Sequence, residues 1–402
     1  MNKFIKFLQV SDIHLDSSFS SSINFPVNKL EIRKSEHKSI ITKVCQIVRD
    51  ENIDLVLIPG DLIDYESSTP DTTNFLIDNF SKISPVPVII TPGNHDYFSP
   101  SSVYNSDFLT GKQQNVWTEN VFIFTAQKFQ SISLPNLKEI SITGISHYEN
   151  RSFYNRLLTD NILKQEGKIN ILVFHGSRDG YCPSDKKITL PFSDEELFKL
   201  GFDYSAIGHY HSYLEILDEE GNIKGAYSGC PLGRNLREFG EKFIIIGKIY
   251  EDKKVEIEKR RIDHRIMHKI DIDCTGLNYN EQILNIIAEK VKETTNSKED
   301  IIYVRLFGRF PPGNVINIPD EFLKDDYFHI KFDKSNVQPD YDIKKYLDIP
   351  DILDTTESKF VKKLNVLLKN AKSDSEREII ENAIYYGLDA LIQKCVKPRY
   401  ED

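Results

Sequence analysis

Five apolar runs in this chain each end in a short polar motif. The motifs are Asp12-Ile13-His14, Gly60-Asp61, Gly93-Asn94-His95-Asp96, His175-Gly176 and Gly208-His209-Tyr210-His211. Helical patterns separate the first three runs, and strands that alternate with helices predict an α/β core. Ligands of open α/β sheets bind beyond the carboxyl ends of the strands. We therefore expect the five motifs to lie near one another.

The runs have the length of buried strands. Strands are predicted over residues 4–10, 54–58, 86–91, 170–174 and 204–207, and helices over 30–49 and 72–83. Residues 242–262 alternate apolar and polar side chains, as antiparallel strands do. We expect a first domain over residues 1–262, followed by a linker at 261–268.

The remaining third of the chain has a different pattern. Strand, helix and strand patterns over residues 266–340 fit a small α+β domain. Residues 350–402 form a helical tail, because apolar residues recur there at helical spacing. The two apolar faces are Phe360, Leu364, Leu367 and Leu368, and then Ile380, Ile384, Leu388, Leu391 and Cys395. Such helices pack on a core of their own or dock a partner, and the pattern favours neither.

The polar motifs supply carboxylate, carboxamide and imidazole groups, which suit manganese, iron or zinc. Phosphoester hydrolysis with two ions needs them about 3.5–4 Å apart, with one ligand shared. Asp61 is our candidate for the shared ligand, because it follows Gly60 in a tight turn. Asp12 and His14 can bind one ion, Asn94 the other, and His209 and His211 can serve different ions.

Each motif has an ordinary structural explanation when it is taken alone. An isolated Asp-x-His or Gly-Asp is usually a surface turn, and a single histidine such as His175 is more often structural. The occurrence of all five motifs together favours a metal site over five unrelated turns, because each motif follows a strand pattern in the same chain.

This ordered set resembles the calcineurin-like metallophosphoesterase superfamily, and within it the Mre11/SbcD-type bacterial DNA repair exonucleases. The motifs cover about residues 7–212, and the first continues as His14-Leu15-Asp16-Ser17-Ser18-Phe19, similar to that branch. The resemblance implies a two-layered β-sandwich flanked by helices. It also implies an α+β capping domain and a partner-binding helical tail. The last third of the chain matches these family segments only in their order and size.

The resemblance implies a role for each motif residue. Three residues would bind the first ion and three the second: Asp12, His14 and His211, and then Asn94, His175 and His209. Asp61 would bridge both ions, most often Mn²⁺, with Fe²⁺ or Zn²⁺ as alternatives. His95 would act on the scissile phosphate, positioned by Asp96, while an activated water attacks phosphorus in line.

The resemblance further implies a DNA substrate, a Rad50/SbcC-like coiled-coil ATPase as partner and a homodimer. The start of the chain has no signal-peptide pattern, no apolar run reaches the roughly 20 residues that span a bilayer, and the five cysteines are scattered. We therefore expect a cytoplasmic protein with no membrane segment.

An alternative within the superfamily is a small-molecule or cyclic-nucleotide phosphodiesterase or phosphatase. The net charge of −10 leans slightly toward it, whereas the additional domain and tail lean toward the nuclease. A non-catalytic scaffold would not need the complete motifs. One departure is Asp64, which stands where Mre11-type enzymes often carry a catalytic histidine, and we expect it to be a turn or cap residue.

Four further residues are weaker candidates. His147 could line a cleft, although a structural histidine is the commoner case. Arg178, Arg234 and Arg237 could contact phosphates or form salt bridges, and the sequence does not distinguish these roles.

Overall fold

The computed structural model describes residues 3–112, 114–149, 156, 164–181, 187–311 and 315–396. The chain divides into two compact units, Met1–Met267 and His268–Asp402. Each unit has hydrophobic cores of its own. None of the described helices is long and apolar enough to cross a membrane.

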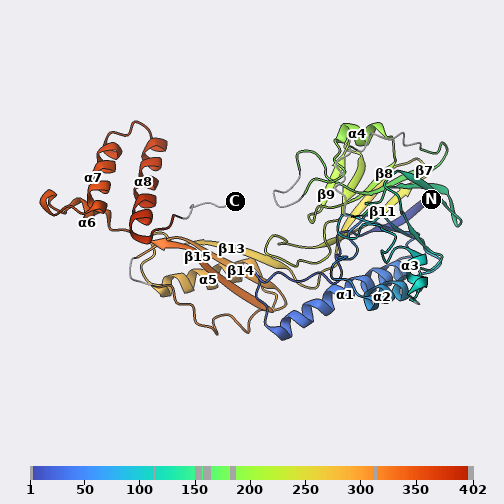
Figure 1. Cartoon of the computed structure of the whole chain (residues 1–402), viewed down its shortest axis with the longest axis horizontal. Coiled ribbons are helices and arrows are strands. Elements are labelled where there is room, and N and C mark those ends of the chain that lie inside the picture. Colours follow the sequence, from blue (N-terminus) through green and yellow to red (C-terminus); the bar gives the residue numbers. More distant parts are fainter. Residues whose placement is uncertain are drawn as a thin grey trace. The chain divides into compact units, whose positions relative to one another are not determined.

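The first unit contains two six-stranded sheets (Figure 1). In one sheet the order is β12-β11-β1-β2-β3-β4, and β1 to β4 run parallel. Its strands are β1 (Phe4–Gln9), β2 (Leu55–Ile58), β3 (Val88–Ile90), β4 (Val121–Ile123), β11 (Phe243–Tyr250) and β12 (Val255–Arg261). β11 and β12 are antiparallel, as their alternating sequence predicts.

The other sheet has the order β5-β6-β7-β8-β10-β9, with β6, β7, β8 and β10 parallel. Its strands are β5 (Gln130–Leu134), β6 (Leu137–Gly144), β7 (Ile169–His175), β8 (Tyr204–Gly208), β9 (Leu214–Leu217) and β10 (Ile223–Tyr227). Every residue of β7 and β8 is buried, which explains why both are continuous apolar runs in the sequence.

Side chains from both sheets form one shared core, so the sheets pack face to face. Phe7 and Leu57 of the first sheet lie in the same cluster as Ile171 and Tyr204 of the second. Gln9 crosses between the layers, because its Nε2 donates to the carbonyl of Ala226 at 2.8 Å. Burying that amide is tolerable because it is hydrogen-bonded.

Helices α1 (Val27–Asp50) and α2 (Pro70–Ser81) cover the outer face of the first sheet. The other helices of this unit are α3 (Ser106–Gly111) and α4 (Asp194–Lys199), and α4 packs on the second sheet through Leu197. α1 buries Ile40, Ile41, Val44 and Val48, which recur at helical spacing and join the core beneath that sheet. The expected α/β class, with β-layers flanked by helices, is confirmed.

The segment after β12 is tied to α1. Asp263 accepts from both terminal nitrogens of the Arg33 guanidinium at 3.1 and 3.2 Å. Arg265 donates from Nε to Glu36 at 2.9 Å. Asp263 and Arg265 are both buried, so the part of the expected linker that they occupy is packed into the first unit.

The second unit begins with a three-stranded sheet of order β13-β14-β15. Its elements are β13 (Met267–Asp273), α5 (Asn280–Thr294), β14 (Ile301–Phe310) and β15 (His329–Pro339). α5 buries Ile283, Ile287 and Val291, spaced four residues apart, against the sheet. This arrangement agrees with the α+β pattern in the sequence.

The tail folds into a helical group with a small core of its own. It comprises α6 (Ile343–Leu347), η2 (Asp351–Leu353), α7 (Thr356–Lys369), α8 (Asp374–Leu388) and the π-helical turn η3 (Asp389–Gln393). Val361, Ile384 and Leu388 form its centre. Other apolar side chains point outward, among them Val366 and Leu367 at 59% and 52% exposure. The tail therefore has both a core and an uncovered apolar surface.

A buried ion pair fixes η3 to β14. The Arg309 guanidinium donates to the two oxygens of Asp389 at 3.2 and 2.7 Å, and the Tyr341 hydroxyl donates to Asp389 at 2.8 Å. Asp389 is fully buried and Arg309 is 9% exposed. Removing one partner of such a pair leaves an uncompensated charge inside the protein.

We predict that Asp389→Ala destabilises the second unit by about 3–5 kcal/mol, because Arg309 loses its only buried carboxylate partner among the described residues. Thermal or urea unfolding of the full chain measures the change. Glu378→Ala, at an exposed position of α8, is the matched control and should remain within about 0.5 kcal/mol of wild type. Equal stability of the two variants would contradict a structural role for the pair.

Candidate metal centre

The loops after β1, β2, β3, β7 and β8 meet at the carboxyl ends of these strands. Their backbones are hydrogen-bonded to each other: Asp12 N donates to Gly60 O at 3.2 Å and His14 N to Asp61 O at 2.8 Å. The Asp12 carboxylate in turn accepts from the backbone N–H of His209 at 3.1 Å. All five motifs are therefore brought together, as the sequence predicts.

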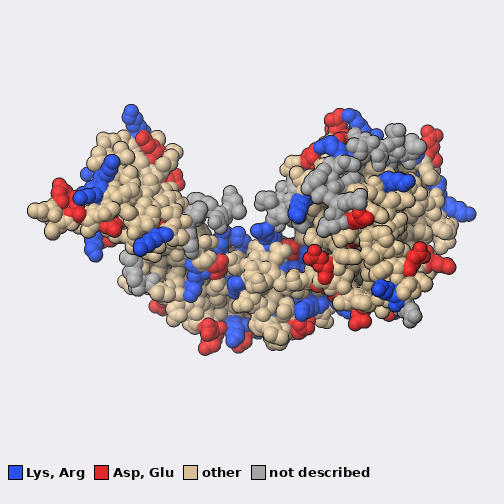
Figure 2. Space-filling model, viewed as in Figure 1, with Lys and Arg blue, Asp and Glu red and all other residues tan. Residues whose placement is uncertain are grey.

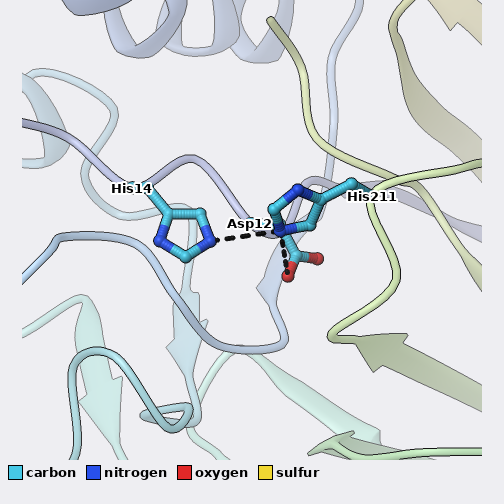
Figure 3. A group of neighbouring side chains, drawn as sticks. All are labelled: Asp12, His14 and His211. Atoms are coloured by element: carbon cyan, nitrogen blue, oxygen red, sulfur yellow. Dashed lines mark hydrogen bonds and ion pairs between the residues drawn. The ribbon is translucent and has the colours of Figure 1, made fainter. Parts of the chain in front are cut away.

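One cluster consists of Asp12, His14 and His211. Figure 3 shows the two imidazoles turned toward each other, with the Asp12 carboxylate beside the His211 ring. His14 Nε2 and His211 Nε2 are 3.3 Å apart, and His211 Nε2 lies 3.8 Å from Asp12 Oδ1. Two nitrogens and one carboxylate oxygen that converge in this way can hold a divalent cation.

A second cluster is built around His175. Its Nε2 lies 3.0 Å from Asn94 Oδ1, 3.3 Å from His209 Nδ1 and 3.3 Å from Asp61 Oδ2. An amide oxygen, two imidazole nitrogens and a carboxylate oxygen thus face one small volume. This group also suits a borderline divalent cation.

Asp61 belongs to both clusters. Its Oδ2 atom lies 3.4 Å from His14 Nε2 and 3.3 Å from His175 Nε2. Asp61 is 1% exposed, and Oδ2 is a buried oxygen without a hydrogen-bond partner in the described structure. A buried carboxylate oxygen in that state is costly. A pair of cations, one in each cluster, would satisfy it, so the residues fit a centre for two metal ions.

The outer ring nitrogens of three histidines are fixed by acceptors. The contacts are His175 Nδ1 to Pro59 O at 3.0 Å, His209 Nε2 to Lys187 O at 2.9 Å and His211 Nδ1 to Glu238 Oε1 at 2.7 Å. A ring nitrogen facing a carbonyl or carboxylate oxygen carries the proton. In the neutral imidazole the opposite nitrogen then has its lone pair toward the cluster, which is the tautomer that a metal ligand needs.

Charges in the centre shift the pKa of its members strongly. Burial raises the pKa of Asp61, but the electrostatic interactions with the nearby imidazoles, first that of His175 and then that of His14, outweigh burial and hold the pKa well below its usual value. Burial lowers the pKa of His175, yet the Asp61 carboxylate beside it raises the pKa to about 9. Burial and the charge of Arg234 lower the pKa of His14. A cation bound by His175 would displace its proton.

Several residues of the centre adopt left-handed backbone conformations. Positive φ angles occur at Asp12 (53°), His14 (50°), Asp61 (52°) and His209 (114°). Such conformations are uncommon outside glycine and are concentrated at functional sites. Gly208 has a separate reason to be small, because a Cβ there would lie 1.8 Å from the carbonyl oxygen of Pro59.

His95 stands at the open side of the clusters. Its side chain is exposed, and its ring centroid lies 4.8 Å from that of His14. Its backbone N–H donates to Asp61 Oδ1 at 2.9 Å. The imidazole is thus adjacent to the centre and accessible to a substrate.

Asp96 acts on the backbone of the turn. Its carboxylate accepts from the N–H groups of Asp61, Leu62 and Gly93 at 3.1, 2.7 and 2.6 Å, and from the Tyr104 hydroxyl at 2.6 Å. The Asp96 carboxylate that accepts these four hydrogen bonds is fully buried. Asp96 therefore joins the turn that carries His95 to the turn that carries Asp61, which is a less direct positioning than we expected.

The weaker candidates have structural partners. His147 is buried and its Nε2 lies 2.6 Å from Thr189 Oγ1. Arg178 forms an ion pair with Asp194. Arg237 is exposed, and Asp64 is partly exposed beyond the strand end. None of these contacts adds a ligand to the two clusters.

Two contributors were missed in the sequence. Glu238 reaches His211 from the loop between β10 and β11, and Tyr104 supports Asp96 from the segment before α3. Arg234 pairs with Glu238 at 3.2 Å rather than standing free for a phosphate. The contact of Glu238 with His211 joins residues 27 apart in the chain, and no motif marks Glu238 or Tyr104 in the sequence.

The sequence pattern of the family described as calcineurin-like phosphoesterase matches residues 5–213. Two relatives match most of the chain. An uncharacterized metallophosphoesterase, YhaO of Bacillus subtilis, is 25% identical over 80% of this chain and 76% of its own length. The DNA double-strand break repair protein Mre11 of Sulfurisphaera tokodaii is 24% identical over 93% of this chain and 91% of its own.

A third relative matches a shorter part of the chain. It is a component of the SbcCD nuclease of Staphylococcus epidermidis, the SbcD protein. The two sequences are 24% identical over 51% of this chain and 58% of the relative's own length.

We predict that Asp61→Asn weakens metal binding by more than the roughly 10- to 100-fold loss that follows mutation of an outer-shell partner. The amide keeps the shape but removes the charge that faces both clusters. The change in metal binding is measured as the manganese that stays bound after equilibrium dialysis, determined by inductively coupled plasma mass spectrometry. Asp64→Asn is the matched control and should keep the wild-type metal content. Wild-type content in Asp61→Asn would reject the shared position of Asp61.

Proposed function

The chain belongs to the calcineurin-like phosphoesterase family, and from this premise we propose that it is a metal-dependent DNA nuclease. It would hydrolyse phosphodiester bonds as an exonuclease, with endonuclease activity as a second mode. The observation that carries the proposal is the meeting of two ligand clusters at Asp61 Oδ2. The match to Mre11 supports DNA as the substrate, because it extends over both units.

Each cluster residue has a proposed role in holding the ions. The first ion would be bound by Asp12, His14 and His211, the second by Asn94, His175 and His209, and both by Asp61. Two divalent ions so held activate water and stabilise charge on a phosphate. Manganese is the proposed ion, with iron and zinc as the alternatives for the same ligand types.

His95 is the proposed catalytic residue. An exposed imidazole beside the clusters can donate a hydrogen bond to the phosphate and a proton to the leaving oxygen. Asp96 would keep His95 in place by joining its turn, through the N–H of Gly93, to the turn at Asp61 and Leu62. The His95 imidazole would thus supply the proton for the leaving oxygen, a step that the residues binding the ions are not free to perform.

We predict that His95→Ala keeps its metal content and loses about 10²- to 10⁴-fold in hydrolysis rate, the range typical of a general acid or base. The rate is measured with bis-p-nitrophenyl phosphate and manganese, with bound metal determined on the same sample. His264→Ala, at an exposed position away from the motifs, is the control. Full activity of His95→Ala would refute this role.

A second function is favoured by the charge distribution. The net charge is −10, and Lys and Arg side chains lie among Asp and Glu side chains on the face drawn in Figure 2. A small-molecule or cyclic-nucleotide phosphodiesterase would need no basic surface. Labelled linear and hairpin DNA, assayed beside bis-p-nitrophenyl phosphate and cyclic nucleotides, separates the two functions. Turnover of the small diesters with none of the DNA forms would reject the nuclease.

The proposed partner is a Rad50/SbcC-like ATPase, bound through the helical tail. Support comes from uncovered apolar side chains on α7 and α8, namely Val366, Leu367 and Ile379, the last 66% exposed. Apolar side chains clustered on a surface mark interaction sites more often than isolated ones do. The homodimer that the resemblance implies stays a prediction.

We predict that the double variant Val366→Ser/Leu367→Ser weakens binding to such an ATPase by at least about tenfold, as expected for an interface hot spot. Lys363→Ser, at an exposed position of the same helix, is the control. Affinity is measured with the purified full-length proteins by calorimetry, and hydrolysis of bis-p-nitrophenyl phosphate should be unchanged. Wild-type affinity in the double variant would place the partner elsewhere.

A further inference from the structure

The two clusters differ in what supports their histidines from outside. His175 and His209 of the second cluster both face neutral backbone carbonyls, those of Pro59 and Lys187. His211 of the first cluster faces the carboxylate of Glu238 instead, at 2.7 Å. The difference lies in charge, because a carbonyl is neutral and a carboxylate is an anion.

Glu238 is itself held firmly. It is 4% exposed, and its Oε1 accepts from His211 Nδ1 at 2.7 Å and from Arg234 Nη2 at 3.2 Å. Its Oε2 accepts from the backbone N–H of Arg234 at 2.7 Å. Arg234 is anchored in turn, because its Nη1 donates to Ser17 Oγ at 2.7 Å. The loop that carries Glu238 is thus attached to the loop that carries the first motif.

A carboxylate acceptor changes the imidazole that donates to it. Hydrogen bonds to an ionised acceptor are about twice as strong as neutral ones. A metal-binding histidine whose outer N–H meets a carboxylate is a more basic ligand in a fixed orientation. His211 Nε2, which faces His14 and Asp12, should therefore bind a cation more tightly than a histidine supported by a carbonyl.

The remaining ligands distinguish the clusters less. Asp61 is shared, and the Asp12 carboxylate lies near His211 but also near Asp61 and His175. Asn94 adds a neutral amide to the second cluster. The carboxylate support of His211 is thus the main feature that favours a cation in the first cluster.

We infer that Glu238 is a positioning residue that makes the Asp12–His14–His211 cluster the tighter of two metal sites, so that the ions bind in sequence. The inference rests on the metal centre of the proposed function. Its consequence is regulatory, because the first site would remain filled while the second follows the free metal concentration. Hydrolysis that needs both ions would then respond to metal supply through the weaker site.

Calorimetric titration of manganese chloride into the metal-free full chain tests this inference. Wild type should bind in two classes of different affinity. Glu238→Gln keeps the size of the side chain and removes its charge, and should weaken the tight class by about 10- to 100-fold while leaving the weaker class unchanged. Glu241→Gln makes the same change at an exposed position of the same loop and should match wild type.

Further variants distinguish support of His211 from a purely structural role. Arg234→Met/Glu238→Gln removes both charges of the buried pair and should show the same selective loss. Glu238→Asp retains the charge and should restore part of the tight binding. Thermal unfolding of each metal-free variant reports whether it folds.

Two results would overturn the inference: equal affinities in wild type, or the same loss in both classes for the folded Glu238 variants. Because the titration contains no substrate, these results are independent of whether the protein cleaves DNA.

Discussion

The buried carboxylate of Asp61 is the constraint around which the first unit is organised. One of its oxygens accepts from the His95 N–H, and the other faces two imidazoles with no hydrogen-bond donor in the described structure. A buried anion in that state needs positive charge nearby to offset the loss of hydration. Its pKa, lowered by His175 and His14 against the effect of burial, reflects this requirement. Strands, turns and outer contacts together hold the carboxylate at the meeting point of two potential cation sites.

The face-to-face sandwich provides the rigidity that this site needs. β1, β2 and β3 of one sheet and β7 and β8 of the other end at the site, and Gln9 links the layers just before it. Left-handed turns at Asp12, His14 and Asp61 cost conformational energy. The buried bonds of Asp96 to three turn N–H groups offset part of that cost. Catalytic precision of this kind depends on such supporting bonds as much as on the ligands.

Much of the fold was predictable, because buried strands and amphipathic helices have strong periodic signals. β2 was expected over 54–58 and lies at Leu55–Ile58, and α2 was expected over 72–83 and lies at Pro70–Ser81. A linker was expected at 261–268, and its residue Asp263 pairs with the distant Arg33 of the first unit. The tail could not be decided from pattern alone. It has both a core around Leu388 and an exposed surface around Leu367.

The sequence by itself determined which residue types could form the metal centre and the strand ends at which they would stand. Ligand chemistry and the periodicity of apolar residues are local properties, so both can be seen in a linear chain. Only the tertiary structure decided which ligands share a cluster, that Asp61 faces both, and that Glu238 supports His211 while carbonyls support His175 and His209. Those pairings join residues far apart in sequence, and they exist only because the packing of two sheets brings their loops together.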